Sequence, residues 1–386
     1  MSTPQDVQNR QAASEPLPYV PVLRPRLPSA ERIVTYLRRI DAARIYTNRG
    51  PLAQELESRL QARLDLPEGG MAIASSGTTA IVGAILASVG RATAQRPLAM
   101  MPAYTFVATA VAAEQCGYRA YIVDVDPETW MLAPEALAHH KALAQTGVVI
   151  PVAPYGRPTP QAPWRAFQAA TGVPVVVDGA ASFDRVLAAP EAFLGAIPVA
   201  FSFHATKAYA TGEGGAVASN DVELIQRTRQ ALNFGFHGAR DCQTPSVNGK
   251  ISEYHAAVGL AEDDGWADKA GALQGVVDSY RRRLGARFYG APDIGLSYGL
   301  LLCRNLAETQ AVVQAFERAD IDCRHWYGAG AHRQTHYAGA SRDALGVTEN
   351  LAPRLLGLPM APDLGEREIG RVAVAIAEGL RDAANA

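Results

Sequence analysis

The sequence predicts an α/β protein built on a largely parallel sheet with helices on both faces. Short apolar runs rich in β-branched residues alternate with Ala-rich helical stretches through the middle of the chain. The segment 173–177 is almost entirely valine, as expected of a central strand that is buried on both faces. The chain has 386 residues, of which 48% are hydrophobic. We therefore expect a large α/β domain with a second, smaller one.

The expected strands and helices follow one another in order along the chain. The apolar runs predicted as strands are residues 97–101, 119–125, 148–152, 173–177 and 197–203. The stretches predicted as helices between them are residues 108–116, 134–144 and 164–170. Parallel neighbours need crossover connections, and helices supply them.

After about residue 265 the pattern changes. Helices dominate residues 265–287, short strands are expected around 295–303, and a last helix is expected over 366–383. We place a boundary near 245–265. The resulting division is an N-terminal arm (1–30), a large domain (31–250) and a small C-terminal domain (251–386).

One stretch has the length of a membrane span. Residues 71–90 contain no charged side chain. The small polar residues 75–79 near its start favour a turn and a helix buried in a globular core instead. Residues 1–18 are polar and lack the apolar region of a secretory signal. We therefore expect a soluble, cytoplasmic protein.

The net charge and the spacing of the cysteines argue against several classes of protein and of site. Lys and Arg number 36 and Asp and Glu 38, a net charge of −2. A nucleic-acid coat protein or a polybasic membrane binder would show an excess of Lys and Arg. The four cysteines are far apart and include no CxxC pair, so we expect reduced thiols and no zinc site.

Polar groups gather where predicted strands end. Asp178 ends the valine-rich strand, and Ser202 lies at the end of the strand 197–203. The turn 102–106 follows a third strand. Ligands bind at the carboxyl edge of open α/β sheets, so these groups should converge. The segment Ser76-Gly77-Thr78 precedes a helix, which makes it either a phosphate cradle or a plain helix cap.

Lys207 suggests a single ligand that all of these groups could bind. It directly follows an apolar strand and precedes a Gly-rich turn, whereas most lysines lie on a solvated surface. A buried lysine amine can form a Schiff base. Pyridoxal phosphate requires such a lysine, an anion cradle, a flat side chain against its ring and a carboxylate at its pyridine nitrogen. The residues that match these needs are Lys207, Ser76–Thr78 with Ser202, Phe106 and Asp178.

With these residues in place, the sequence resembles the DegT/DnrJ/EryC1/StrS sugar aminotransferases, a fold-type I group that uses pyridoxal phosphate. The resemblance covers about residues 17–380. The matching segments are 46–51 (YTNRGP), 76–80 (SGTTA), 102–109 (PAYTFVAT), 124–126 (DVD), 151–156 (PVAPYG), 177–181 (VDGAA), 201–215 (FSFHATKAYATGEGG), 248–260 (NGKISEYHAAVGL) and 356–360 (LGLPM). The Lys207 segment is the most specific of them.

The resemblance implies a fold and a set of cofactor contacts. The fold is aspartate-aminotransferase-like: a large domain with a mostly parallel seven-stranded sheet covered by helices, and a smaller α+β C-terminal domain. Lys207 would hold the cofactor and later move the proton, and Asp178 would keep the pyridine nitrogen protonated. Phe106 would stack on the ring. The residues expected at the phosphate are Ser76, Gly77, Thr78 and Ser202, with Asn248 reaching it across a homodimer interface. When the family resemblance is set aside, the alternative is that Asn248 is a turn residue before Gly249.

The sequence also departs from the family pattern. Ala181 stands at a cofactor-binding position where the family often has Gln or His. His204 lies where a subgroup carries His-Ala-Thr-Lys, and either a catalytic role or a hydrogen-bonded core position suits it. The further candidates for substrate binding are Asn48, Arg49, Arg240, Lys250 and Arg324, each of which taken singly reads as a surface residue.

The activity implied is transfer of an amino group from L-glutamate to a keto group of a nucleotide-linked sugar, of the dTDP-4-keto-6-deoxyhexose type, for amino-deoxysugar biosynthesis. A nucleotide-sugar 3-aminotransferase, a non-aminating enzyme such as a dehydratase or decarboxylase, and a cofactor-binding regulator remain alternatives. Relatives with His in place of the lysine are dehydratases, so Lys207 favours transamination. A Rossmann-type nucleotide module ranks last because no GxGxxG follows a strand.

Overall fold

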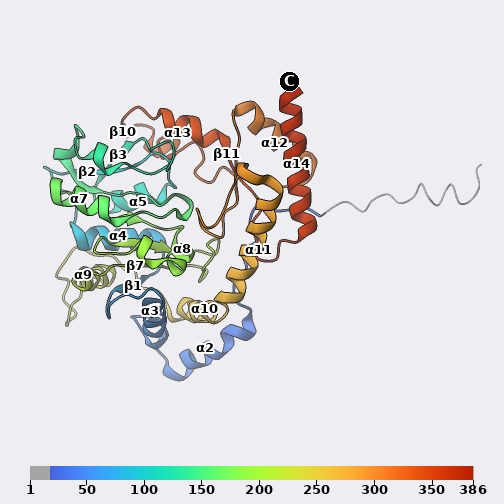
Figure 1. Cartoon of the computed structure of the whole chain (residues 1–386). Helices are drawn as coiled ribbons and strands as arrows, with labels where there is room; N and C mark the ends of the chain where they lie inside the picture. The colour runs from blue at the N-terminus through green and yellow to red at the C-terminus, as the bar shows by residue number, and fades with distance from the viewer. Residues whose placement is uncertain (1–17, 386) are drawn as a thin grey trace, which may run out of the picture.

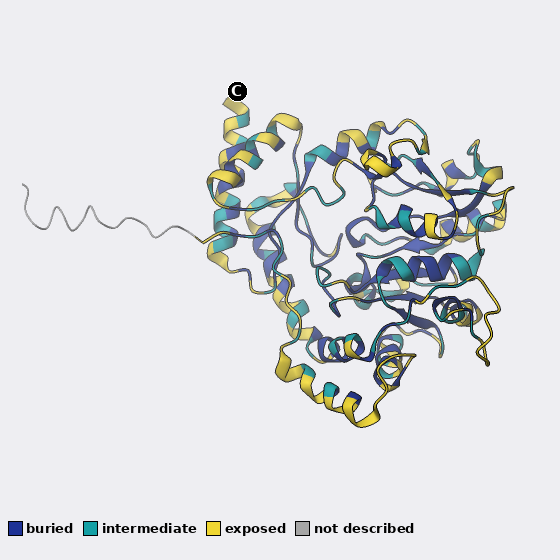
Figure 2. Cartoon of the chain, turned by 180° about the vertical axis from the view of Figure 1, so that it is seen from behind, coloured by how far each residue is buried: buried dark blue, intermediate teal, exposed yellow. Residues whose placement is uncertain are grey.

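The computed structural model describes residues 18–385. One body contains the large sheet and its helices, and the C-terminal helices α11, α12 and α14 stand beside it (Figure 1). Burial follows this arrangement, because the strands and the helix faces against them are buried while outer helix faces are exposed (Figure 2).

The large sheet contains the seven strands that the family resemblance predicted. They are β1 (Met71–Ala74), β2 (Leu98–Pro102), β3 (Arg119–Val123), β4 (Thr146–Val149), β5 (Val177–Asp178), β6 (Val199–Ser202) and β7 (Gly215–Ala218). Their order is β1-β7-β6-β5 and β4-β2-β3, and parallel bridges from Val149 to Val175 and from Val152 to Asp178 join the two parts. The two-residue strand β10 (Ser341–Arg342) adds an edge beside β3.

The pairing is largely parallel, as expected. Strand β7 is the exception, because it runs antiparallel to both β1 and β6. The strand expected over 173–177 is shorter than predicted. Only Val177 and Asp178 form β5, and before it Val175 makes a single parallel bridge to Val149. The neighbouring Pro174 has no N–H to donate to another strand.

Two strands were not predicted. We expected residues 71–90 to form a turn and a buried helix, but Met71–Ala74 forms β1, and the helix α4 (Gly77–Ser88) begins only after it. Strand β7 was also not predicted, since no element was assigned to residues 215–218. Both strands consist mainly of Ala, Gly and Met with a single β-branched residue each, so neither shows the usual strand composition.

Helices cover the large sheet. They are α3 (Pro51–Arg63), α4, α5 (Ala108–Gln115), α6 (Pro134–Leu137), α7 (Gln161–Thr171), α8 (Phe183–Ala188) and α9 (Val222–Leu232). The helices expected at 108–116 and 164–170 are confirmed as α5 and α7. The helix expected over 134–144 ends early, at Leu137. The His140 ring there accepts a hydrogen bond from the Ala142 N–H, and a short 3-10 turn follows.

The C-terminal region adds a small antiparallel sheet and long helices. Its elements are α10 (Glu253–Asp264), α11 (Trp266–Leu284), β8 (Phe288–Tyr289), β9 (Leu300–Leu302), α12 (Leu306–Arg318), α13 (Gly346–Leu351), β11 (Leu355–Gly357) and α14 (Glu366–Asn385). The sheet order is β11-β9-β8, and α14 packs against α11 and α12. The helices predicted at 265–287 and 366–383 are confirmed as α11 and α14. The domain limits themselves stay a prediction.

The described part of the predicted arm lies against this C-terminal region. Val20 bridges to Ile321, and Leu23 bridges to Met360. Residues 1–17 lie outside the described part of the chain. None of the helices within residues 18–385 is long and apolar enough to cross a membrane.

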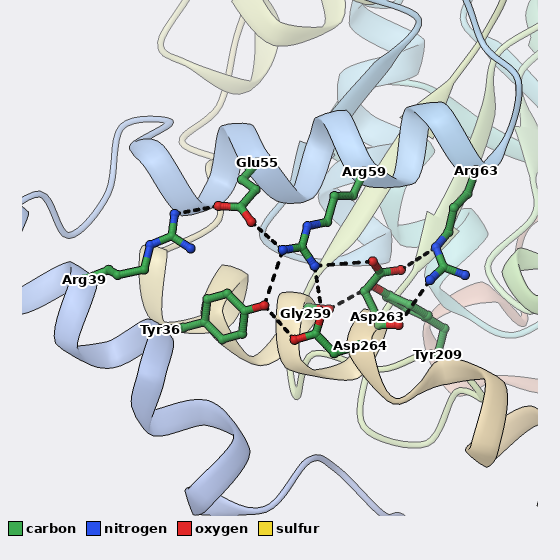
Figure 3. A network of polar contacts seen from close by, with 9 residues as sticks. All are labelled: Tyr36, Arg39, Glu55, Arg59, Arg63, Tyr209, Gly259, Asp263 and Asp264. Atoms are coloured by element: carbon green, nitrogen blue, oxygen red, sulfur yellow. Dashed lines mark hydrogen bonds and ion pairs between the residues drawn. The ribbon is translucent and has the colours of Figure 1, made fainter.

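Helix α2 (Ala30–Ala43) is held to α3 and α10 by a network of ion pairs (Figure 3). The Tyr36 hydroxyl donates to Asp264 at 2.6 Å, and Arg59 pairs with Asp264 at 2.8 Å. Arg63 pairs with Asp263 at 2.7 Å. Asp263 is buried, so its charge depends on these partners.

We predict that Arg63→Gln lowers the free energy of unfolding by about 1–3 kcal/mol, because the buried Asp263 carboxylate loses its nearest cation. The matched control is Arg318→Gln, which breaks an exposed pair with Asp382 and should change stability by less than about 0.5 kcal/mol. Urea unfolding measures both. If Arg63→Gln lowered the free energy of unfolding no more than Arg318→Gln does, the network would not stabilise the fold.

Candidate active site

A cavity of about 540 Å³ opens at the carboxyl ends of β5 and β6. It is lined by the start of α4, by the segment after β2, by the residues around Asp178, and by the segment after β6 that carries Lys207. The C-terminal region closes it with Tyr298, Arg324, Trp326 and Tyr327. The convergence expected at this edge of the sheet is therefore present.

Lys207 reaches the cavity from a tight turn that follows β6. Its own N–H donates to the His204 carbonyl at 2.8 Å, and the Ala205 N–H donates to the Gly212 carbonyl at 2.8 Å, so the loop closes on itself. Buried Phe203 and Tyr209 on either side pack against the ring of Phe183. The Lys207 amine is half-buried and donates to the Tyr298 hydroxyl at 3.0 Å.

Asp178 is a buried carboxylate that faces the same cavity. The Thr109 hydroxyl donates to its Oδ2 at 2.6 Å, and the Ala180 N–H donates to its Oδ1 at 3.0 Å. Burial raises the pKa of Asp178, while these two hydrogen bonds and the charge of Lys207 oppose the rise. The hydrogen bonds also fix the direction in which the carboxylate points.

The start of α4 provides the anion cradle. The N–H groups of Gly77 and Thr78 lie in the first helical turn, where no intrahelical acceptor exists. Ser202 lies so close that a Cβ on Gly77 would come 2.6 Å from the Ser202 Cβ, so only glycine fits there. The Ser76 hydroxyl, which we expected at a phosphate, accepts the Thr79 N–H in a capping box. The Ser76 side chain therefore already serves as the helix cap.

Aromatic and small apolar side chains complete the wall. Phe106 lines the cavity and is 58% exposed in the single chain. Ala181 is buried and offers only a methyl group. Two substrate candidates, His204 and Arg324, also line this cavity.

The other predicted residues lie elsewhere in the single chain. Asn48, Arg49 and Lys250 line a second cavity of about 210 Å³. The Lys250 amine donates to the Asn248 Oδ1 at 2.6 Å. Arg240 is exposed and borders neither of these two cavities.

Several residues that border the cavity or support its side chains were not predicted. Thr109 comes from α5, one turn beyond Phe106, and only the fold shows that it meets Asp178. Tyr298, Trp326 and Tyr327 come from the C-terminal region. Their segments carry no strand-end pattern, so their sequence context gave no signal for the site.

Comparisons with known proteins identify the family of the chain. The model of the DegT/DnrJ/EryC1/StrS aminotransferase family matches residues 29–377. Protein Rv3402c of Mycobacterium tuberculosis is 30% identical over 376 residues, covering 94% of this chain and 90% of that protein. The chain belongs to the DegT/DnrJ/EryC1/StrS aminotransferase family. It is therefore a transaminase whose cofactor is pyridoxal phosphate, as predicted.

The chain is also similar, at lower identity, to other aminotransferases. The dTDP-4-amino-4,6-dideoxy-D-glucose transaminase of Escherichia coli is 25% identical over 374 residues, covering 92% of this chain and 96% of the relative. The solved structure of DesI in the presence of its TDP-sugar product has a TM-score of 0.81 at 26% identity, with 95% of this chain and 94% of that chain covered. A Bacillus cereus aminotransferase structure has a TM-score of 0.83 at 24% identity, covers 93% of this chain and confirms the fold.

The cavity fits the cofactor of this aminotransferase family. A buried carboxylate, a half-buried amine and the uncapped N–H groups of a helix start all border one space. These are the groups that an aldehyde-bearing pyridine with a phosphate requires. Ser202 lies so close to Gly77 that position 77 has no room for a side chain. The N–H groups of the cradle are therefore not covered by a side chain from position 77.

A second buried carboxylate, Asp184, lies behind the site. Its Oδ2 accepts the Leu296 N–H at 2.7 Å. Burial raises the pKa of Asp184 to about 6. An acid whose pKa is higher in the folded than in the unfolded chain binds more protons when folded. Its contribution to stability is therefore present at low pH and is lost as pH rises through about 4 to 6.

We predict that Asp184→Asn removes this pH dependence. From pH 4 to pH 7 the free energy of unfolding of the wild type should fall relative to that of Asp184→Asn by about 2–3 kcal/mol. Urea unfolding at several pH values measures the difference. If the free energies of unfolding of the two proteins changed equally with pH, the raised pKa of Asp184 would be contradicted.

Proposed function

We propose that this aminotransferase moves an amino group from L-glutamate to the keto group of a nucleotide-linked sugar, of the dTDP-4-keto-6-deoxyhexose type, for amino-deoxysugar synthesis. The observation that carries the proposal is that the Lys207 amine and the buried Asp178 carboxylate border one cavity. The relative from Escherichia coli, named for a dTDP-4-amino-4,6-dideoxy-D-glucose, supports the substrate class.

Each side chain of the site has a role in this proposal. Pyridoxal phosphate, when bound, supplies an aldehyde carbon and a ring that withdraws electrons. The Lys207 Nζ would hold that carbon, and its amine would also be the group that moves a proton to and from the substrate. Asp178 would supply the negative charge for the ring nitrogen. Phe106 would pack on the ring, and Ala181 would leave room beside it.

The phosphate contacts follow from the start of α4. The N–H groups of Gly77 and Thr78 and the Ser202 hydroxyl would bind the phosphate, helped by the helix dipole. Ser76 acts indirectly, since its hydroxyl caps the turn that presents those N–H groups. Arg324 and His204, at the mouth of the cavity, would contact the substrate.

We also propose that the enzyme is a homodimer. Phe106, Tyr46, Phe234 and Tyr254 are large hydrophobic side chains that are each at least 44% exposed in the single chain. A partner subunit would cover them and bring its Asn248, Asn48 and Lys250 to the first cavity. The Lys250 ammonium and the Arg49 guanidinium would then face the diphosphate of the substrate. A cytoplasmic location stays a prediction.

The second candidate is amino transfer to a 3-keto sugar. One relative, from Acidithiobacillus ferrooxidans, is named as a UDP-N-acetyl-3-dehydro-alpha-D-glucosamine 3-aminotransferase and is 26% identical over 281 residues. Incubation with a panel of nucleotide-linked 3-keto and 4-keto sugars, followed by mass spectrometry of the products, decides between the two. The dehydratase alternative is disfavoured because Lys207 is present.

We predict that purified protein with pyridoxal phosphate shows the visible band of a lysine-bound cofactor, and that L-glutamate bleaches it. Lys207→Ala should lose the band and at least about 10³-fold of the transaminase rate, because both the attachment and the proton carrier are gone. Absorbance spectra and a glutamate-dependent assay measure the two effects. An unchanged band in Lys207→Ala would show that another group holds the cofactor.

The homodimer gives a separate prediction. Light scattering should show a dimer, and Asn248→Ala should weaken pyridoxal phosphate binding by about tenfold, since one charge-assisted hydrogen bond is lost. Arg240→Ala, a change on an exposed residue outside both cavities, is the control and should leave the affinity unchanged. A monomer with full activity would remove the role proposed for Asn248.

A further inference from the structure

Residues 295–299, here called the strap, pass from the C-terminal region across the back of the active site. The Gly295 N–H donates to the Tyr155 carbonyl at 2.7 Å. The Leu296 N–H donates to the Asp184 carboxylate at 2.7 Å. At its far end, the Gly299 carbonyl accepts the Leu358 N–H at 2.8 Å. The strap thus connects the large sheet region to the small sheet.

Backbone packing leaves the strap little freedom at its start. A Cβ on Gly295 would lie 2.9 Å from the Ala181 carbonyl oxygen. A Cβ on Gly156 would lie 3.0 Å from the Gly295 nitrogen and 2.5 Å from the Ala181 oxygen. Three backbone segments therefore meet at a distance that only glycine permits. Movement of the strap would break its hydrogen bonds to the Tyr155 carbonyl and to the Asp184 carboxylate at the same time.

The strap carries Tyr298 to the catalytic lysine. The Tyr298 hydroxyl accepts the hydrogen bond from the Lys207 amine at 3.0 Å. The Tyr298 ring is buried and packs edge-on against the rings of Tyr155, at 5.4 Å between centroids, and Trp326, at 5.6 Å. Because two aromatic rings fix the phenol ring, the position of its oxygen is fixed as well.

We propose that Tyr298 is a positioning residue that holds the Lys207 amine in the cavity, and that Asp184 acts through the Leu296 N–H to keep the strap in place. This rests on the proposed role of Lys207. The amine stands on a flexible four-carbon stem, and ordering such a side chain costs conformational entropy. A fixed acceptor offsets that cost before the reaction begins, which raises the rate of each step in which the amine takes part.

The first test measures cofactor capture by the apoprotein. In capture the Lys207 nitrogen joins the aldehyde carbon of pyridoxal phosphate, and one water leaves. Tyr298→Phe should slow the appearance of the lysine-bound band about tenfold, and it should lower kcat about 10- to 100-fold with KM for the sugar changed less than twofold. The lysine that reacts is identified by borohydride reduction and mass spectrometry.

Tyr104→Phe is the matched control. Tyr104 belongs to the same buried aromatic cluster, and its hydroxyl bonds to the Tyr155 hydroxyl at 2.7 Å without touching Lys207. Tyr104→Phe therefore also removes a hydroxyl from this buried cluster. We expect a similar change in Tm in the two variants, but slowed capture in Tyr298→Phe alone.

The second test addresses the anchor. Asp184→Ala removes the acceptor of the Leu296 N–H and should slow capture about as much as Tyr298→Phe. Asp184→Asn keeps an acceptor oxygen and should restore the capture rate to within about twofold of the wild type. If Asp184→Ala does not fold, Tyr298→Phe and its control still decide the role of the phenol.

Several results would overturn the proposal. If Tyr298→Phe captures the cofactor and turns over at wild-type rates while the wild type is an active transaminase, only the positioning role fails. Equal slowing in Tyr104→Phe would make the effect a general one of the cluster and would also overturn it. A wild type that never attaches pyridoxal phosphate at Lys207 overturns both this inference and the proposed function.

Discussion

The buried carboxylate of Asp178 is the constraint on which the site depends. An ionised group without solvent is expensive unless hydrogen bonds and charges stabilise it. The last residue of β5 receives both, from the Thr109 hydroxyl, the Ala180 N–H and the charge of Lys207. Strand β5 lies between β4 and β6, where parallel carboxyl ends converge. A carboxylate placed there faces the cavity and not the core.

The remaining groups take their places from the same sheet. Strand β6 ends at Ser202 and leads directly to the Lys207 turn, and β1 leads into α4 and its uncovered N–H groups. The amine and the carboxylate therefore come from the neighbouring strands β6 and β5, and the cradle comes from β1, which is separated from β6 by β7. The C-terminal region supplies the aromatic wall, and the strap ties that wall to the sheet through Tyr155 and Asp184.

The sequence allowed part of this to be predicted. The valine-rich run before Asp178 and the apolar strand before Lys207 are local patterns. Asp178 ends β5 and Lys207 lies in the turn after β6, as expected. Strands β1 and β7 were not predicted because each is short, consists mainly of small residues and has a single β-branched residue. The seven-stranded count came from the family resemblance and not from periodicity.

Other features depend on contacts that no local pattern encodes. Tyr298 lies 91 residues from Lys207 in the chain, yet the two side chains are hydrogen-bonded. Asp184 meets Leu296 across 112 residues. The Ser76 side chain was expected at a phosphate, but its capping bond to the Thr79 N–H depends on where α4 begins. Asn48 and Lys250 lie at a second cavity, so their part in catalysis depends on a partner subunit.

The most direct measurement of the central claim concerns the cofactor nitrogen that Asp178 is proposed to face. The protein would be loaded with pyridoxal phosphate labelled with ¹⁵N in the ring, and the nitrogen chemical shift recorded for the wild type and for Asp178→Asn. A protonated ring nitrogen in the wild type that becomes unprotonated in Asp178→Asn is the result expected. The same chemical shift in both proteins would contradict the pairing of Asp178 with the ring.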